Sequence, residues 1–200
     1  MKVVVIGATG TIGQAVVRLI SSHHDILGVS HSRGKLRVDL ASKDSIRTLF
    51  KEVGPFDALI SAAGVARFGP LAELSDDDFR LSLDNKLMGQ VNLVRMGRDY
   101  IRDRGSFTLT SGVLSREPTA GSAAISLVNA GIEAFVRAAA LELPHDIRIN
   151  AVSPVWVTET LKALGRDTAG GMPADQVALA YRESVERNRT GEILDVRQFV

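Results

Sequence analysis

Hydrophobic and polar positions follow two patterns along this chain: short apolar runs, and longer segments in which apolar residues recur every three or four positions. The first run, residues 2–6, reads Lys-Val-Val-Val-Ile and is typical of a strand buried on both faces of a parallel sheet. Residues 14–20 place Ala, Val, Leu and Ile at helical spacing, as expected for a helix that packs on such a sheet. The same patterns predict strands over residues 25–30, 36–40 and 56–64 and a helix over 42–53.

Strands and helices alternate in the second half of the chain as well. An alternation of this kind indicates an α/β fold, a doubly wound parallel sheet with helices on both faces. At this length we expect residues 1–200 to form a single domain with a substantial core. The patterns predict helices over residues 75–102 and 121–143 and strands over 105–112, 147–154 and 190–196.

Composition excludes several classes of function. The formal net charge is +1 and no cluster of Lys and Arg forms a patch, so we expect no nucleic-acid partner. There is no cysteine, which excludes disulfides, thiolate zinc sites and a cysteine nucleophile. His23 and His24 lack further ligands at metal spacing, and we predict no metal site. No apolar run reaches membrane-spanning length, so we expect a cytoplasmic protein with no membrane partner.

A glycine-rich turn follows the first predicted strand directly. Residues 7–13 read Gly-Ala-Thr-Gly-Thr-Ile-Gly and lead into the first predicted helix. A strand, glycine turn and helix in this order bind the pyrophosphate of a dinucleotide, because the turn exposes backbone N–H groups and the helix N-terminus favours an anion. Three glycines within seven residues also occur in simple tight turns. The position after the strand favours the dinucleotide interpretation and a Rossmann fold.

The polar loop after the second predicted strand indicates which dinucleotide is bound. NAD sites often place a carboxylate at the end of this strand, but the chain has Ser30, His31, Ser32 and Arg33 there, followed by Gly34 and Lys35. A guanidinium and hydroxyls suit a 2′-phosphate, which an acidic residue would repel. An ordinary solvated loop has a similar composition. We therefore predict NADP(H) in preference to NAD(H).

Several short segments, taken in order, resemble the short-chain dehydrogenase/reductase superfamily over nearly the whole chain. They are the glycine turn, Val38-Asp39-Leu40, Ser61-Ala62-Ala63-Gly64, Leu109-Thr110-Ser111 and residues 148–154, Arg-Ile-Asn-Ala-Val-Ser-Pro. The resemblance implies that Asp39 holds the adenine amino group and that Ser61 to Gly64 lie beneath the adenosine ribose. It also implies that Thr158 contacts the nicotinamide carboxamide and that the glycine-rich residues 161–173 form a substrate lid.

The residues expected to bind cofactor come from this resemblance and from the loops described above. They are Gly7, Thr9, Gly10, Thr11, Ile12, Gly13, Ser30, His31, Ser32, Arg33, Asp39, Leu40, Ser61, Ala62, Ala63, Gly64, Pro154, Val157 and Thr158. The resemblance further implies a homodimer or homotetramer formed through the helix predicted at 121–143.

The catalytic centre departs from the family pattern. Ordinary members use a Tyr-x-x-x-Lys pair, in which the tyrosine transfers a proton and the lysine lowers the tyrosine's pKa. Alignment of the helix at 121–143 puts Ile125 at the tyrosine position and Asn129 at the lysine position. Tyrosine occurs only at positions 100 and 181, so the pair is absent in any register.

One exchange could compensate for this loss. Ser111 occupies the position of the serine that holds the substrate oxygen in the family. Lys86 occupies the position of an asparagine that belongs to the family's proton relay, three residues before Gly89. Lys86 would then supply the positive charge missing at position 129, and Asn129 a neutral hydrogen-bonding group. Alternatively, Lys86 is a solvated helix residue, as most lysines are.

We therefore predict an oxidoreductase that moves a hydride between the nicotinamide and a small carbonyl or alcohol substrate, with Ser111, Lys86 and Asn129 in the catalytic centre. A catalytically silent NADP(H) sensor or regulatory module is the main alternative. An isomerase or epimerase that uses the nicotinamide transiently is a third, although it still requires a base.

Overall fold

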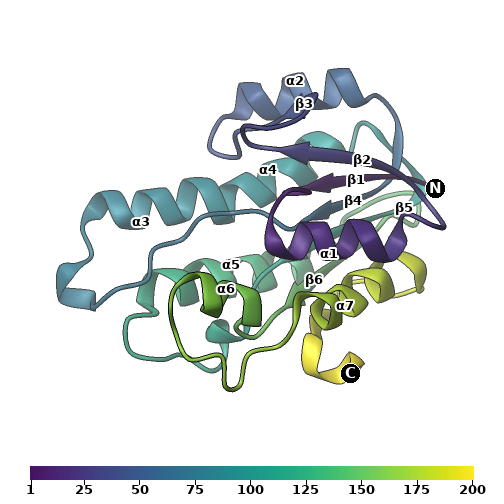
Figure 1. Cartoon of the computed structure of the whole chain (residues 1–200). Coiled ribbons are helices and arrows are strands. Elements are labelled where there is room, and N and C mark those ends of the chain that lie inside the picture. The colour runs from purple at the N-terminus through teal and green to yellow at the C-terminus, as the bar shows by residue number, and fades with distance from the viewer.

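Seven parallel strands form one sheet, in the order β3-β2-β1-β4-β5-β6-β7, in the computed structural model, which describes residues 1–200 (Figure 1). The chain winds outward from β1 in both directions, so a crevice opens at the carboxyl ends of β1 and β4. This confirms the predicted doubly wound sheet. The strands are β1 (Lys2–Ile6), β2 (Asp25–Ser30), β3 (Leu36–Arg37), β4 (Phe56–Ser61), β5 (Ile101–Thr110), β6 (Arg148–Ser153) and β7 (Ile193–Asp195).

Helices cover both faces of the sheet because its strands alternate buried side chains above and below. In β1, Val3 and Val5 pack toward α1 (Thr11–Ile20) and α7 (Ala174–Glu186), which lie together on one face (Figure 1). Val4 and Ile6 pack toward the other face. That face is covered by α2 (Lys43–Val53), α4 (Met88–Gly97) and α5 (Ala123–Ala139). None of the helices has the length and apolar character that crossing a membrane requires.

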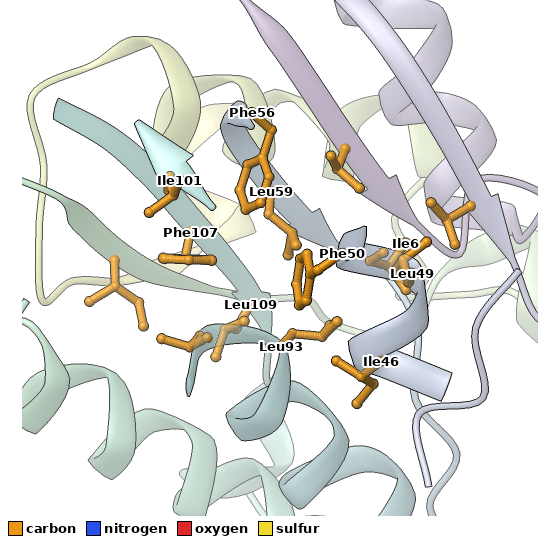
Figure 2. Packing of buried hydrophobic residues seen from close by; sticks show 14 of the residues in the cluster. Ile6, Ile46, Leu49, Phe50, Phe56, Leu59, Leu93, Ile101, Phe107 and Leu109 are labelled. Carbon is orange, nitrogen blue, oxygen red and sulfur yellow. The ribbon is translucent and has the colours of Figure 1, made fainter. Parts of the chain in front are cut away.

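Aromatic side chains fill the core beneath α2 and α4. Phe50 stacks on Phe56 with ring centroids 5.8 Å apart, and Phe56 meets the edge of Phe107 at 6.2 Å (Figure 2). All three are fully buried, and burial of each side chain contributes about 1.5–3 kcal/mol. Gly97 lies so close to Phe50 that a Cβ there would be 2.9 Å from the ring. Helix α4 can therefore approach the sheet only with a residue that has no side chain at this position.

The helix predicted over residues 75–102 is wrong at its carboxyl end. Helix α4 stops at Gly97, and β5 begins at Ile101. The N–H of Tyr100 donates to the Gly97 carbonyl and turns the chain, and Tyr100 then stacks on Phe50 at 5.6 Å. Strand β5 starts earlier than the predicted 105–112 and ends at Thr110. Its register against β4 shifts between Ile101 and Ser106, and Arg104 within this irregular stretch has a φ of 62°.

The same predicted helix is also interrupted in its middle. It begins as α3 (Asp76–Ser82) with a reciprocal cap between Ser75 and Asp78, then passes through a π turn (Leu83–Leu87) before α4. A π turn contains one more residue than an α turn, so it changes the direction of the side chains that follow. Here it carries Lys86, which is buried.

Other predicted elements are longer than the observed ones. The strand predicted at 36–40 is reduced to two residues because Asp39 starts a turn, in which its carboxylate accepts from the Ala41 N–H. The helix predicted at 121–143 spans Ala123–Ala139, and the last predicted strand spans Ile193–Asp195. Within residues 161–173, the first three belong to α6 (Thr158–Ala163).

Candidate active site

The glycine turn after β1 is built from close backbone contacts. Gly7 has a φ of +82°, and a Cβ there would lie 2.6 Å from the Ala62 carbonyl oxygen. A Cβ on Gly13 would lie 2.0 Å from the Gly7 carbonyl oxygen, whereas one on Gly10 would lie 3.3 Å away. Helix α1 has no side-chain N-cap and no acidic residue in its first turn. Its first N–H groups are therefore available to an anion.

The loop after β2 divides its polar residues between structure and solvent. Ser30 is buried, and its hydroxyl accepts from the Arg33 N–H at 2.9 Å and donates to the Arg33 carbonyl. Because these bonds occupy the hydroxyl, Ser30 shapes the loop. The side chains of His31, Ser32 and Arg33 are exposed beside the crevice.

The segment after β3 and the end of β4 complete this side of the crevice. One Asp39 carboxylate oxygen accepts from the Ala41 N–H at 3.0 Å, and the Asp39 N–H donates to the Ser45 hydroxyl. Leu40 is buried against Gly89 of α4. At the end of β4, the Ser61 hydroxyl is buried and has no hydrogen-bond partner.

A cavity of about 260 Å³ lies next to this crevice, where the segments after β4, β5 and β6 converge. Its apolar side chains come from several elements, and Lys86 is its only ionisable residue. Three predicted positions therefore meet in one place: Lys86, Ser111 and Asn129. The lining is Ile12, Ala62, Ala63, Gly64, Lys86, Thr110, Ser111, Gly112, Val113, Leu114, Ile125, Asn129, Pro154, Val155, Trp156, Val157 and Thr160.

Lys86 reaches the cavity from the π turn. It is 9% exposed, and its Nζ donates one hydrogen bond, to the Ser111 carbonyl oxygen at 3.3 Å. Burial lowers the pKa of the Lys86 ammonium to about 8, since removal from water disfavours the charged form. Its stem lies against Gly64, where a Cβ would come within 3.0 Å of the Lys86 Cγ. The interpretation of Lys86 as a solvated helix residue is wrong.

Asn129 faces the same cavity from α5. It is 1% exposed, and its Nδ2 donates weakly to the Gly112 carbonyl oxygen at 3.4 Å. Its Oδ1 is buried and has no donor within the protein. Buried polar atoms are normally satisfied, so this oxygen marks a place where a ligand hydroxyl or N–H fits.

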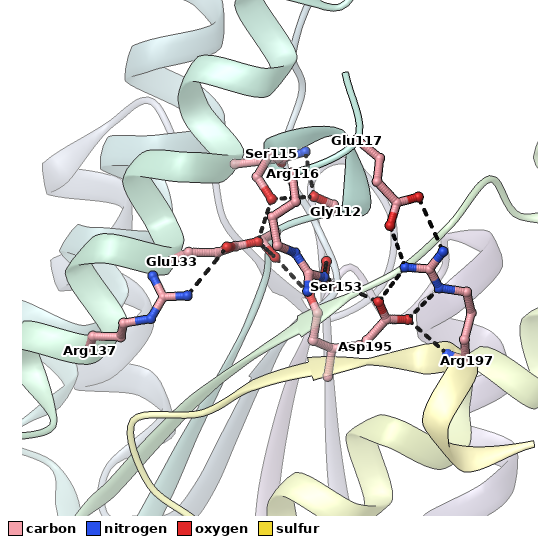
Figure 3. Close-up of polar contacts among 12 residues, drawn as sticks. Gly112, Ser115, Arg116, Glu117, Glu133, Arg137, Ser153, Asp195 and Arg197 are labelled. Atoms are coloured by element: carbon pink, nitrogen blue, oxygen red, sulfur yellow. Dashed lines mark hydrogen bonds and ion pairs between the residues drawn. The ribbon is translucent and has the colours of Figure 1, made fainter. Parts of the chain in front are cut away.

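The Ser111 hydroxyl is held by a carboxylate that the sequence interpretation did not consider. Glu133 lies one turn after Asn129 on α5, and its Oε1 accepts from Ser111 at 3.2 Å and from Ser115 at 2.6 Å (Figure 3). Arg137 approaches the other oxygen at 3.7 Å. Glu133 is thus a buried carboxylate held by two hydroxyl donors and a nearby cation.

A second polar network fixes the loop that carries Ser115. Arg116 donates to Ser153 and Asp195, while Arg197 joins Asp195 to Glu117 (Figure 3). Hydrogen bonds from Arg197 lower the pKa of the Asp195 carboxyl below its usual range. The network ties the end of β7 to the segment just after β5. No short sequence motif marks these partners, which lie far apart along the chain.

Neither tyrosine of the chain borders the cavity. Tyr181 of α7 is fully buried beneath it, and its hydroxyl shares a 2.6 Å hydrogen bond with Thr110. Burial raises the pKa of the Tyr181 hydroxyl above its usual range. Tyr100 stacks on Phe50 in the core. Ile125, the residue that the sequence alignment puts at the family's tyrosine position, lines the cavity.

Trp156, which lines the cavity, belongs to a cluster with a second aromatic residue and an arginine. Trp156 follows β6 and meets Phe68 edge-on at 5.9 Å. The Arg166 guanidinium, from the predicted lid, lies 5.4 Å from the Phe68 ring and 5.6 Å from the Trp156 ring. Thr158 begins α6 beside Gly171, and its N–H donates to the Met172 carbonyl. Cation–π contacts of Arg166 thus join the predicted lid to Trp156 of the cavity lining.

The chain is similar to known proteins in sequence and in fold. The family model described as enoyl-(acyl carrier protein) reductase matches residues 6–199. The chain is 33% identical to the short-chain dehydrogenase/reductase ATR9 of Stachybotrys chlorohalonatus, over 79% of this chain and 72% of that protein. It is 29% identical to 2,3-dihydro-2,3-dihydroxybenzoate dehydrogenase of Bacillus subtilis, over 92% and 78% respectively.

Solved structures give closer matches. The protein lin1944 from Listeria innocua superposes with a TM-score of 0.94, with 38% identity over 98% of this chain and 99% of that one. A small-chain dehydrogenase in complex with NADPH superposes with a TM-score of 0.88, with 31% identity over 98% and 95%. The chain therefore belongs to the short-chain dehydrogenase/reductase superfamily.

Proposed function

We propose that this protein is an NADP(H)-dependent oxidoreductase that moves a hydride between the nicotinamide and the carbon of a small carbonyl or alcohol substrate. The observation that carries the proposal is a cavity beside the dinucleotide crevice whose only ionisable residue, Lys86, is buried. Membership of an oxidoreductase superfamily and the similarity to a protein solved with NADPH support it.

Two features of the crevice support the binding of a phosphorylated dinucleotide. Gly7 and Gly13 leave no room for side chains, so the turn and the N–H groups of α1 form a cradle for a pyrophosphate. Exposed Arg33 and Ser32 would hold the 2′-phosphate, and the free carboxylate oxygen of Asp39 the adenine amino group.

Residues at the other end of the crevice would hold the nicotinamide half. The unpartnered Oδ1 of Asn129 would accept from a ribose hydroxyl, and Thr158 at the start of α6 would contact the carboxamide. The same ribose hydroxyl that donates to Asn129 could accept a hydrogen bond from the Lys86 ammonium.

Lys86 performs the proton transfer in this proposal. The bound nicotinamide supplies or accepts the hydride. In the direction of reduction, the Lys86 ammonium donates a proton to the substrate oxygen as charge develops there. In the direction of oxidation, the neutral amine accepts that proton. A pKa near 8 leaves both forms accessible near neutral pH.

Ser111 has a supporting role. Its carbonyl oxygen positions Nζ of Lys86, and its hydroxyl is turned toward Glu133. The hydroxyl would polarise a substrate oxygen only after rotating away from Glu133. We therefore assign the larger share of catalysis to Lys86.

Steady-state NADPH oxidation against a panel of small aldehydes and ketones tests this proposal. We expect Lys86→Met to lose at least about a hundredfold in kcat/KM, the scale of general acid catalysis, with Kd for NADPH changed much less. Lys162→Met, an exposed lysine on α6, is the matched control and should leave both values unchanged. Undiminished turnover in Lys86→Met would overturn the role of Lys86.

A reciprocal exchange provides a second test. Lys86→Asn combined with Asn129→Lys restores the family's arrangement of these two residues. If the two positions share one function, the double variant should have a higher kcat/KM than the two single effects multiplied together predict. Additive losses would show that the positions act independently.

A silent NADP(H) sensor is the second candidate, favoured by the absence of a tyrosine from the cavity. Titration calorimetry with NADPH, NADP and NAD separates the two functions. Tight NADPH binding without hydride transfer to any compound of the panel would support the sensor. Failure to bind any of the three would overturn both candidates.

A further inference from the structure

Lys86 lies in an environment that favours a neutral amine. Lys86 forms no ion pair: the only polar contact of its Nζ is the Ser111 carbonyl oxygen. Asp84 on the same π turn is exposed, and Glu133 is occupied by Ser111, Ser115 and Arg137. With burial lowering the pKa of Lys86 to about 8, about one molecule in ten carries the neutral amine at pH 7. A solvated lysine has a neutral fraction smaller by a factor of about 200.

The position of this amine is also fixed. The stem of Lys86 is packed against Gly64, and the single hydrogen bond of Nζ goes to the Ser111 carbonyl oxygen over 3.3 Å. A neutral amine that donates one N–H to a carbonyl keeps its lone pair for another atom. Nucleophilic lysines are activated by the same two features, desolvation and a defined position.

The cavity around Nζ accepts small apolar molecules. Ile125, Val155 and Trp156 contribute apolar walls, and the volume of about 260 Å³ is sufficient for a compact aromatic or aliphatic group. No carboxylate in the lining would reprotonate the amine or repel a carbonyl oxygen.

We infer that Lys86 is a nucleophilic amine that forms a reversible imine with small apolar aldehydes entering this cavity, without any nicotinamide cofactor. The neutral Nζ adds to the carbonyl carbon, and one amine proton moves to the oxygen to give a carbinolamine. The C–O bond then breaks and water leaves with the second amine proton, giving a C=N bond. Hydrolysis reverses both steps. The site is shared with the proposed reductase, but hydride transfer is not required.

Reductive trapping of the full-length protein tests the inference. The protein is incubated at pH 7 with benzaldehyde and sodium cyanoborohydride, which reduces imines to stable benzylamines. Peptide mass spectrometry then compares the rate of benzylation at Lys86 with that at exposed Lys162 in the same molecule. The ratio of neutral fractions alone would make Lys86 react about 200 times faster than Lys162. Restricted access to the cavity lowers this ratio, and we expect Lys86 to react at least about tenfold faster. An equal or slower rate at Lys86 would overturn the inference, and this comparison requires no variant.

Two controls separate reactivity from local unfolding. Lys86→Arg keeps a cation but cannot form an imine, and should abolish the fast phase while Lys162 reacts as before. Labelling in urea below the unfolding transition should leave the ratio of the two rates unchanged if the folded cavity is responsible. Failure of trapping with normal NADPH-dependent turnover would overturn the imine alone, whereas fast trapping without any NADPH binding would overturn only the reductase.

Discussion

Arg197 and Glu117, eighty positions apart in the sequence, form a two-point ion pair with N–O distances of 2.7 and 3.2 Å. The pair is half-exposed, but Arg197 also donates to Asp195, whose side chain is only 8% exposed. Asp195 in turn accepts from Arg116. The strength of the network therefore depends mainly on the buried carboxylate.

Asp195→Asn should lower the free energy of unfolding by about 1–3 kcal/mol, because two guanidinium groups lose a charged acceptor. Glu117→Gln should have a smaller effect, since exposed pairs contribute little. Urea denaturation of both variants checks this order. A larger loss in Glu117→Gln would show that the exposed pair carries the stabilisation.

The pKa of Lys86 predicts opposite pH dependences for the two directions of the reaction. Reduction needs the ammonium, so kcat/KM should be constant below about pH 8 and fall about tenfold per pH unit above it. Oxidation needs the neutral amine, so its kcat/KM should rise about tenfold per pH unit up to about pH 8 and stay constant above it. Profiles of kcat/KM against pH, measured for the wild type in both directions, test this prediction. The Lys86→Arg variant should show no change of slope near pH 8 in either direction.

The same shift also predicts a change in stability with pH. The folded pKa of about 8 lies below the reference value of 10.5, so folding disfavours the protonated lysine. The contribution of Lys86 to stability should therefore fall as pH decreases from about 10.5 to 8 and stay constant below that. Lys86→Met should remove this slope, measured as the difference between variant and wild-type unfolding curves across that range.

Arg33 should determine the preference between phosphorylated and unphosphorylated cofactor. Arg33→Gln removes a charged donor from the exposed loop after β2, and should weaken NADPH binding about tenfold to hundredfold while NADH binding is retained. Titration calorimetry of both cofactors measures the ratio. Lys35→Gln, an exposed neighbour, is the control. Equal weakening of both cofactors would place Arg33 outside the 2′-phosphate site.

The two glycines of the turn should respond differently to a methyl group. Gly13→Ala forces a Cβ to within 2.0 Å of the Gly7 carbonyl oxygen and should abolish dinucleotide binding, with a loss of about 1–3 kcal/mol in stability. Gly10→Ala places its Cβ at 3.3 Å and should retain the fold. Calorimetry and thermal unfolding of the two variants compare these outcomes.

Tyr181 offers a check on the assignment of the proton donor. Tyr181→Phe removes one buried hydrogen bond to Thr110 and should cost about 1 kcal/mol in stability. Turnover should be almost unchanged, because Tyr181 does not border the cavity. A hundredfold loss of turnover with normal NADPH binding would instead identify Tyr181 as part of the proton relay.

Most of the fold could be predicted from local patterns. Strands such as Lys2–Ile6 bury both faces, and α2 is capped by Ser42, whose hydroxyl accepts from the Ser45 N–H as its type and position suggest. The end of α4 could not be predicted from local sequence. The helix ends at Gly97, which packs closely against Phe50 and Phe107 from distant segments. Tertiary packing, which local propensity does not encode, decided that boundary.

The candidate site shows the same division. Lys86, Ser111 and Asn129 were found because their sequence spacing matches a known pattern, and they meet at one cavity. Glu133 was missed because its partners, Ser111 and Ser115, lie on another segment. A carboxylate on a helix face carries no local signal of burial, so only the packing of α5 against the segment that follows β5 reveals its partners.

The π turn at Leu83–Leu87 determines the direction in which the side chains of α3 point relative to those of α4. Each residue of an α-helix advances the side chains by about 100°, so the deletion of one residue here would convert the π turn to an α turn and rotate α3 by that angle. Ser82 and Asn85 bind the N–H groups of Arg67 and Val65, and both contacts would be misdirected. A one-residue deletion should therefore displace the segment that follows Gly64 of the cavity lining, leaving the sheet intact.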